Sequence, residues 1–324
     1  MATDFLHGAE FIEVESGYRQ IKTARSSIIG LVGLASKGPI NIPTLITNYV
    51  EAVTTFGAYE GTDTDGYTIP KALKEIFDQG NNSAMVVCVN VFDPAVHKSG
   101  EPPEPDPGEV EASDIVGEVD SLTGKRSGIE ALLDVQGIYG FKPRILIAPE
   151  WSHESTVITA LKAKVDQLKA IALIDIEAGT TKDEAVTFAS TNGGDRVMLL
   201  YPYVKRTYGD TQVLRPESPI WAGVMSKTDN ELGWWWSPSN KEVNGVEGQE
   251  FPIDFGISDV NSWANILNEA NISTIINAQG WRTWGNRLDA TDTKFAFISV
   301  RRTFDIVIDS MELAVIQFID RPIN

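Results

Sequence analysis

The sequence contains very little cysteine, histidine and basic charge. Its 324 residues include one cysteine, three histidines, and 27 Lys and Arg against 45 Asp and Glu, for a formal net charge of −18. A single cysteine excludes an intrachain disulfide, and Cys88 lies in the apolar run 84–89, where a thiol is normally buried and reduced. An acidic surface repels the phosphate backbone of nucleic acids, so we expect no direct DNA or RNA partner.

Long apolar runs and a basic leader are also missing. No stretch approaches the ~18 consecutive apolar residues that span a membrane, and residues 1–4 lack the basic start of a secretory signal. We therefore expect no membrane partner, and synthesis and folding in the cytoplasm.

The patterns that usually carry enzyme or metal chemistry are absent from the sequence. His7, His97 and His153 form no His-x-x-x-His pair, there is no Cys-x-x-Cys, and no Gly-x-Ser-x-Gly nucleophile elbow occurs. We expect no catalytic residue, no metal and no cofactor.

Residues 30–39 come closest to a phosphate-binding loop. A Walker A loop needs two glycines five apart followed by Lys and Ser or Thr, whereas here Pro39 follows Lys37 and Gly38. This favours a strand that ends in a turn. The alternative is an α/β enzyme that binds a nucleotide near Gly30 to Gly38, and saturable nucleotide binding weakened by Lys37→Ala would support it.

The remaining pattern predicts an α/β fold, with a mixed sheet covered by helices on both faces and an extended N-terminal arm. Strand-length apolar runs occupy residues 28–34, 44–47, 85–91, 144–148, 170–175, 196–201 and 273–276. Helical spacing occupies residues 49–56, 69–78, 129–135, 155–168, 181–189, 220–230, 261–268 and 303–319. We divide the chain into an arm (1–22), the first part of the core (23–97), a solvent-exposed acidic, proline-rich connector (98–124), the remainder of the core (125–300) and a final helical segment (301–324).

The arm alternates apolar and polar residues, as an extended segment does. Such a segment needs a sheet edge to pair with, and that edge can belong to its own domain or to a neighbouring subunit. The sequence leaves both alternatives open.

Several stretches, in order along the chain, carry a resemblance to one family. They are residues 7–15, 26–35 and 142–149 in the first half, and 201–202, 235–240, 265–272, 282–287, 300–303 and 317–324 in the second. Together they resemble the contractile tail sheath proteins of bacteriophages, in the branch that includes P2-like phages and R-type bacteriocins.

The sequence departs from this family pattern at two places. Relatives often carry a larger domain near Lys98 to Val110, where this chain has only the connector. Relatives also continue past a position like Asn324 with a small C-terminal domain and an arm. We therefore expect the sequence to be truncated, with residues 301–324 leading into a domain that is missing.

The resemblance implies a structural, non-enzymatic subunit that assembles with copies of itself into a helical sleeve. The sleeve surrounds an inner tail tube, contacts baseplate and tail terminator proteins, and contracts to drive the tube through a bacterial envelope. Its free energy is stored during assembly, so no ATP site is needed. The expected location is the virion, after synthesis and assembly in the bacterial host cytoplasm.

The resemblance also suggests which residues join subunits. Arg301 and Arg302 could seat a neighbour's carboxylates or cap local backbone, and we expect them to contact a neighbouring subunit. The alternative setting is the sheath of a bacteriocin or another contractile injection system. The residues expected to exchange strands between subunits are Phe11, Ile12, Glu13, Val14 and Glu15.

Overall fold

The computed structural model describes residues 24–59, 61, 66–80, 84–316 and 319. The predicted arm, including Phe11, Ile12, Glu13, Val14 and Glu15, lies outside the described residues. The expectation of strand exchange through these residues stays a prediction.

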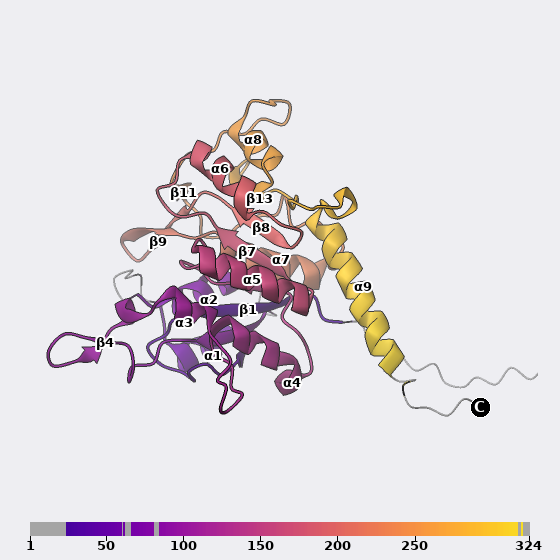
Figure 1. Cartoon of the computed structure of the whole chain (residues 1–324). Coiled ribbons are helices and arrows are strands. Elements are labelled where there is room, and N and C mark those ends of the chain that lie inside the picture. Colours follow the sequence, from indigo (N-terminus) through magenta and orange to yellow (C-terminus); the bar gives the residue numbers. More distant parts are fainter. Residues whose placement is uncertain (1–23, 60, 62–65, 81–83, 317–318, 320–324) are drawn as a thin grey trace, which may run out of the picture.

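An eight-stranded mixed sheet forms the centre of the molecule, in the order β13-β12-β8-β7-β6-β1-β3-β2 (Figure 1). Six neighbouring strands are parallel, and each edge strand is antiparallel to its neighbour. The strands are β1 (Ile28–Gly33), β2 (Thr44–Ile46), β3 (Met85–Asn90), β6 (Ile145–Ile147), β7 (Ile171–Asp175), β8 (Val197–Leu200), β12 (Ile272–Asn277) and β13 (Trp281–Trp284).

Helices cover both faces of this sheet, which confirms the predicted fold class. Alternate residues of β1 enter different layers: Ile28 and Val32 pack in one core, and Ile29 and Leu31 in the other. Such strands are apolar throughout because both faces are buried. The first layer contains α3 (Ala112–Val116), α5 (Ser155–Leu168), α6 (Lys182–Asn192) and α8 (Trp263–Glu269), and the second contains α1 (Tyr49–Phe56), α2 (Thr68–Asp78) and α7 (Ser218–Glu231).

The segment 98–124 is more ordered than the predicted connector. Its first part is an exposed hairpin of β4 (Lys98–Ser99) and β5 (Glu104–Pro105), followed by the 3-10 helix η2 (Pro107–Glu109). Its second part packs on the core, because Val110 and Ile115 are buried. The segment thus contacts the core at these two residues, beside the capping box of Glu111 and Asp114 that starts α3, whereas residues 118–124 are exposed, as expected of a connector.

Several elements differ from the sequence prediction in kind or in extent. Residues 128–139 form a 3-10 helix, η3 (Gly128–Asp134), followed by α4 (Val135–Tyr139), in place of one helix. The final helix, α9 (Ile298–Ile316), begins five residues before the predicted start at residue 303 and follows the 3-10 helix η4 (Thr293–Phe295). A small antiparallel sheet that we did not predict joins β9 (Val204–Tyr208), β10 (Thr211–Arg215) and β11 (Gly248–Gln249).

Candidate assembly surface

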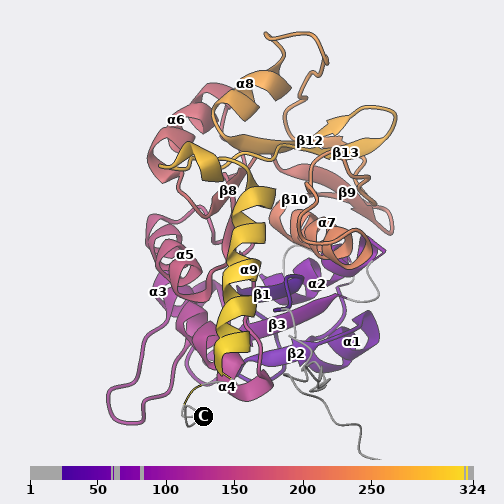
Figure 2. The ribbon, with the colours of Figure 1, turned by 90° about the vertical axis from the view of Figure 1, so that its right-hand side faces the viewer.

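Helix α9 lies on the outside of the body, where Figures 1 and 2 show it as one straight helix in yellow. Its side chains contact, in turn, the segments that directly precede β8, β7, β6 and β1. These four strands are consecutive neighbours in the sheet. The helix therefore crosses the amino-terminal ends of the central parallel strands.

The side of α9 that faces the body is charged. Asp305 is buried and pairs with Arg196, which lies directly before β8. The pair is bidentate: Nη2 of Arg196 donates to Oδ1 of Asp305 at 2.8 Å, and Nη1 donates to Oδ2. The Nε atom of Arg301 lies 3.6 Å from the same carboxylate.

One turn further along α9, three cationic side chains surround Asp309, of which Lys142 is the most distant, with its Nζ 3.9 Å from Oδ2. Arg144, directly before β6, donates to Oδ2, and Lys169 donates to Oδ1 at 2.7 Å and to Glu312 at 2.6 Å. Burial acts to raise the pKa of Asp309, but the hydrogen bonds from Lys169 and Arg144 outweigh it, so its pKa lies below the usual value. This carboxylate is therefore held in its charged form.

Arg302 is the third charged residue on this side of α9. We call Arg302, Asp305 and Asp309 the inner ion-pair row. The guanidinium of Arg302 donates to both oxygens of Asp229 on α7, with Nη1 2.9 Å from Oδ1, and its Nη2 donates to the carbonyl of Ser26 at 3.1 Å. The side chain is buried, so the structure places Arg302 against its own chain. Its expected contact with a neighbouring subunit stays a prediction, and the intramolecular pair gives it a structural role of its own.

Arg301 lies beside this row and is more accessible. Its guanidinium carbon lies 4.8 Å from the ring centroid of Phe295, in a cation–π contact. Like the contact expected of Arg302, the subunit contact expected of Arg301 stays a prediction.

The side of α9 that faces solvent is apolar. We call it the outer stripe, and its five side chains are each between 44% and 62% exposed. Their spacing of four, three, four and four residues places them along one helix face, one above the other. The members of the outer stripe are Val300, Phe304, Val307, Met311 and Val315.

Helix α9 thus reverses the usual arrangement, in which the apolar side faces the core and the charged side faces water. Ile298 and Ile306 are its buried apolar residues, while the outer stripe stays in contact with solvent. Buried ion pairs contribute little net stability because desolvation offsets their attraction, but they fix the position of the groups that they join. The arrangement can hold an apolar surface in a defined place for a partner to cover.

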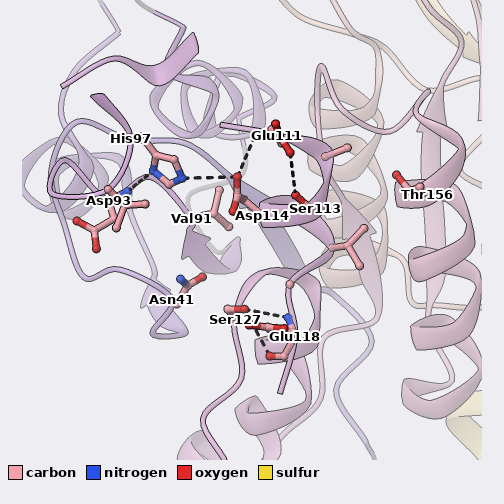
Figure 3. Close-up of a pocket in the computed structure, with 14 residues that line it drawn as sticks. Asn41, Val91, Asp93, His97, Glu111, Ser113, Asp114, Glu118, Ser127 and Thr156 are labelled. Atoms are coloured by element: carbon pink, nitrogen blue, oxygen red, sulfur yellow. Dashed lines mark hydrogen bonds and ion pairs between the residues drawn. The ribbon is translucent and has the colours of Figure 1, made fainter. Parts of the chain in front are cut away.

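A surface hollow of about 760 Å³ lies on another part of the molecule, beside α3 (Figure 3). His97 sits at its wall: Nδ1 accepts a hydrogen bond from the backbone N–H of Asp93 at 2.9 Å, and Nε2 lies 3.5 Å from Asp114. Both ring nitrogens thus have partners within the chain. Within the described ranges, no three or more His, Cys, Asp or Glu side chains are grouped so that they could hold a metal ion.

The first two backbone amides after β1 already have hydrogen-bond partners within the chain. The N–H of Leu34 donates to Thr68 Oγ1 at 3.0 Å, and the N–H of Ala35 donates to Asn90 Oδ1 at 2.8 Å. A phosphate loop needs such N–H groups to point at the ligand, so this geometry favours the turn over the nucleotide site.

A buried carboxylate lies at the opposite, carboxyl-terminal end of β7. Asp175 accepts hydrogen bonds from the backbone N–H of Ser218 at 2.7 Å and from its hydroxyl, at the start of α7. Burial raises the pKa of Asp175 to about 7, although the hydrogen bonds from Ser218 oppose this shift. The group links β7 to α7 and is closed off from solvent.

Among the helices that the structure describes, none is both long and apolar enough to span a membrane.

Comparison with known proteins gives one consistent family. The family model described as the phage tail sheath protein central domain matches residues 124–287. The tail sheath protein of Burkholderia phage BcepMu is 34% identical, over 100% of this chain and 83% of its own length. The tail sheath protein of Escherichia phage P2 is 29% identical, over 99% of this chain and 79% of its own length.

Solved structures share the fold. The helical sheath of the anti-feeding prophage in its contracted state gives a TM-score of 0.67 at 20% identity, covering 99% of this chain and 79% of the other. The sheath complex of an extracellular contractile injection system, PVC, also in the contracted state, gives a TM-score of 0.60 at 16% identity, covering 100% and 78%.

Proposed function

The chain belongs to the phage tail sheath protein family, and we propose that its outer stripe and its N-terminal arm join it to neighbouring subunits. The chain is a structural subunit of a contractile tail sheath. Its family is one of structural tail components and implies no enzymatic activity.

The observation that carries the proposal is the reversed polarity of α9. A subunit that remained a monomer would gain by turning the outer stripe toward its core, at roughly 25 cal/mol for each Å² of apolar surface buried. Instead, three charged residues of the inner ion-pair row hold the helix with that stripe outward. Such an arrangement is useful when another surface covers the stripe in the assembly.

The finer steps of sheath function belong to the same proposal. The sleeve surrounds an inner tail tube, ends at baseplate and tail terminator proteins, and shortens to drive the tube through the host envelope. Assembly takes place in the cytoplasm of the bacterial host. In support, one structural relative is a chain of the anti-feeding prophage baseplate, with a TM-score of 0.64 at 21% identity.

The arm supplies the second contact in this proposal, through strand addition by Phe11, Ile12, Glu13, Val14 and Glu15. Deleting residues 1–20 should leave a folded monomer, because the described sheet and both of its buried cores are formed by residues from Ile28 onward. The deletion should abolish sleeve formation.

The test is negative-stain electron microscopy of the chain and of the deletion variant, each produced together with the inner tube protein. We expect sleeves from the full chain and none from the variant, while circular dichroism shows both to be folded. Equal polymerisation of the two proteins would refute strand exchange through the arm. Failure of both to polymerise at every concentration and salt level would refute self-assembly of this chain.

A bacteriocin or another injection system is the alternative setting for the same subunit. Two structural relatives, the sheaths of the anti-feeding prophage and of PVC, support this alternative setting. The neighbouring genes separate the two, because capsid and packaging genes accompany a phage tail and not a bacteriocin.

A further inference from the structure

The loop that follows α7 presents two tryptophan side chains to solvent. Trp235 and Trp236 are 55% and 49% exposed, although tryptophan side chains are on average largely buried. Leu232, where the loop begins, is exposed as well. We call residues 232–241 the tryptophan loop. Large apolar side chains that gather on one exposed loop mark an interaction site, and tryptophan is enriched among the residues that dominate binding.

The tryptophan loop is held in place at both ends. The N–H of Gly233 donates to carbonyls in the last turn of α7, and the N–H of Lys241 donates to Oγ1 of Thr283 on β13 at 3.0 Å. Trp235 packs edge-to-face on Trp234, with ring centroids 4.9 Å apart, and its ring lies against the backbone of Gly233. Aromatic side chains that are already fixed lose little conformational entropy on binding.

The chemistry of this loop fits a segment that is rich in both proline and acidic residues. Aromatic side chains bind proline rings on their flat apolar faces, as in the aromatic-lined grooves that recognise proline-rich segments. The Nζ atom of Lys241 lies 5.3 Å from the ring centroid of Trp236, so a positive charge stands beside the aromatic surface. A segment in which prolines alternate with carboxylates matches both features.

The hairpin of β4 and β5 is such a segment. Residues 101–107 read Glu-Pro-Pro-Glu-Pro-Asp-Pro, and residues 101–105 are exposed. The two strands pair in antiparallel register, and the hydroxyl of Ser99 donates to Asp106 across the hairpin. The prolines and carboxylates of its tip are therefore presented on a defined backbone.

The hairpin and the tryptophan loop lie on different sides of the molecule. Asp229, three residues before Leu232, pairs with Arg302, so the tryptophan loop begins beside α9. Figure 1 shows α9 on one side of the body and β4 on the opposite side. A contact between the two surfaces therefore needs two copies of the chain. Such a contact is heterologous, and heterologous contacts repeat into rings or helices.

We propose that the β4–β5 hairpin of one subunit binds the tryptophan loop of a second copy. The prolines of the hairpin lie on Trp235 and Trp236, and a hairpin carboxylate pairs with Lys241. This contact is separate from the outer stripe and the arm. On the proposed function, on which this last step rests, the contact recurs between subunits of the sleeve, where repetition strengthens a contact that is weak by itself.

Complementation between two full-length variants tests the contact. One variant, Trp235→Ser with Trp236→Ser, loses the aromatic surface, and the other, Pro102→Ser with Pro103→Ser and Glu104→Lys, loses the matching hairpin. Sedimentation velocity at concentrations up to about 1 mM measures association. We expect each variant alone to associate at least about 10-fold more weakly than the parent. A mixture of the two should associate again, because it contains one intact hairpin and one intact loop.

Two further variants keep the interpretation specific. Lys241→Glu leaves both indoles in place and should also weaken association, because it puts a like charge beside the hairpin carboxylates. The matched control is Leu122→Ser, since Leu122 is 93% exposed and lies outside both surfaces. It should associate as the parent does. Circular dichroism checks that every variant remains folded.

Three results would overturn the proposal. They are a parent chain that stays monomeric at about 1 mM, variants that associate as strongly as the parent, and a mixture that associates no better than either variant alone.

Failure of this proposal is distinguishable from failure of the proposed function. Sleeve formation is measured by microscopy with the inner tube protein, whereas complementation is measured on the chain alone. Sleeves formed equally well by the parent and by both variants would leave the proposed function in place and remove only the contact between hairpin and tryptophan loop.

Discussion

At the scale of single residues, the inner ion-pair row fixes the register of α9. Arg302, Asp305 and Asp309 are three and four residues apart, which places them on one face. Each of them has a partner in a different segment: Asp229 on α7, Arg196 before β8, and Arg144 before β6. Sliding α9 by one residue would separate all three pairs and leave buried charges without partners, which is strongly unfavourable.

The first prediction concerns the pair of Arg302 and Asp229. Replacing Arg302 by Met should lower the free energy of unfolding by about 3–5 kcal/mol, because it leaves the carboxylate of Asp229 buried and unpaired. The double variant Arg302→Met with Asp229→Leu should recover most of this loss, since no charge remains buried. Urea unfolding of the three proteins measures both effects. A single variant within 0.5 kcal/mol of the parent would contradict the register role.

The second prediction concerns pH and Asp309. Its pKa in the folded protein is below the usual value, so its contribution to stability is fully present above the pKa of the unfolded chain. The contribution is lost as pH falls through the lower, folded pKa. The protection factors of α9 amides, which compare each exchange rate with that of the unfolded chain at the same pH, should therefore fall on acidification below about pH 4, and Asp309→Asn should show little of this pH dependence.

Asp175 serves as a control, because its effect on stability should depend on pH in the opposite direction. Its folded pKa of about 7 is above that of the unfolded chain, so in this range the folded state holds more protons. Stability from this group therefore falls as pH rises from about 4 to 7, and is constant above that range. Relative to the parent, Asp175→Asn should flatten the fall in unfolding free energy between pH 5 and 7. An unchanged slope would contradict the raised pKa.

At the scale of secondary structure, the sequence predicts strands best where both faces of the strand are buried in apolar cores. Strands β1, β3 and β7 are almost entirely apolar because both faces of the sheet are covered, with Asn90 and Asp175 as polar last residues of β3 and β7, and their apolar runs are found directly in the sequence. The hairpin of β9 and β10 was missed because Lys205, Thr207 and Gln212 interrupt any apolar pattern. Its pairing is decided by tertiary contacts that a local pattern does not contain.

The candidate assembly surface was predictable only in part. The spacing of apolar residues predicts that α9 is an amphipathic helix, and the structure confirms a helix there. Spacing alone does not say which side faces the body. That depends on Arg144 and Arg196, which are 165 and 109 residues from their partners on α9 and carry no local signal of a contact.

The third prediction tests the orientation of α9 with two substitutions on opposite sides. Ile306→Ala should lower the free energy of unfolding by about 2–4 kcal/mol, since Ile306 is 2% exposed and faces the body. Met311→Ala should change it by less than about 0.5 kcal/mol, because Met311 lies in the outer stripe. Chemical denaturation of both variants gives the comparison. Equal losses, or the reverse order, would show that the outer stripe is buried within the folded subunit and would contradict the outward orientation of this side of α9.

At the scale of the whole molecule, electrostatic repulsion between subunits opposes assembly, whereas apolar contact through the outer stripe favours it. Each chain has a formal net charge of −18, so two copies repel at a distance. Apolar contact is short-ranged and takes effect only when the surfaces meet. The repulsion acts over the Debye length, which is about 30 Å at 0.01 M salt and about 8 Å at 0.15 M.

Assembly should therefore accelerate with added salt, which is the fourth prediction. Raising sodium chloride from 0.01 to 0.15 M screens the repulsion between copies, whereas the inner ion-pair row is buried and screened much less. Light scattering at fixed protein concentration should show faster polymerisation, while exchange within α9 stays constant. Slower polymerisation at higher salt would mean that complementary charges, rather than the outer stripe, bring subunits together, and that the accessible Arg301 is a better candidate for the contact than the apolar face of α9.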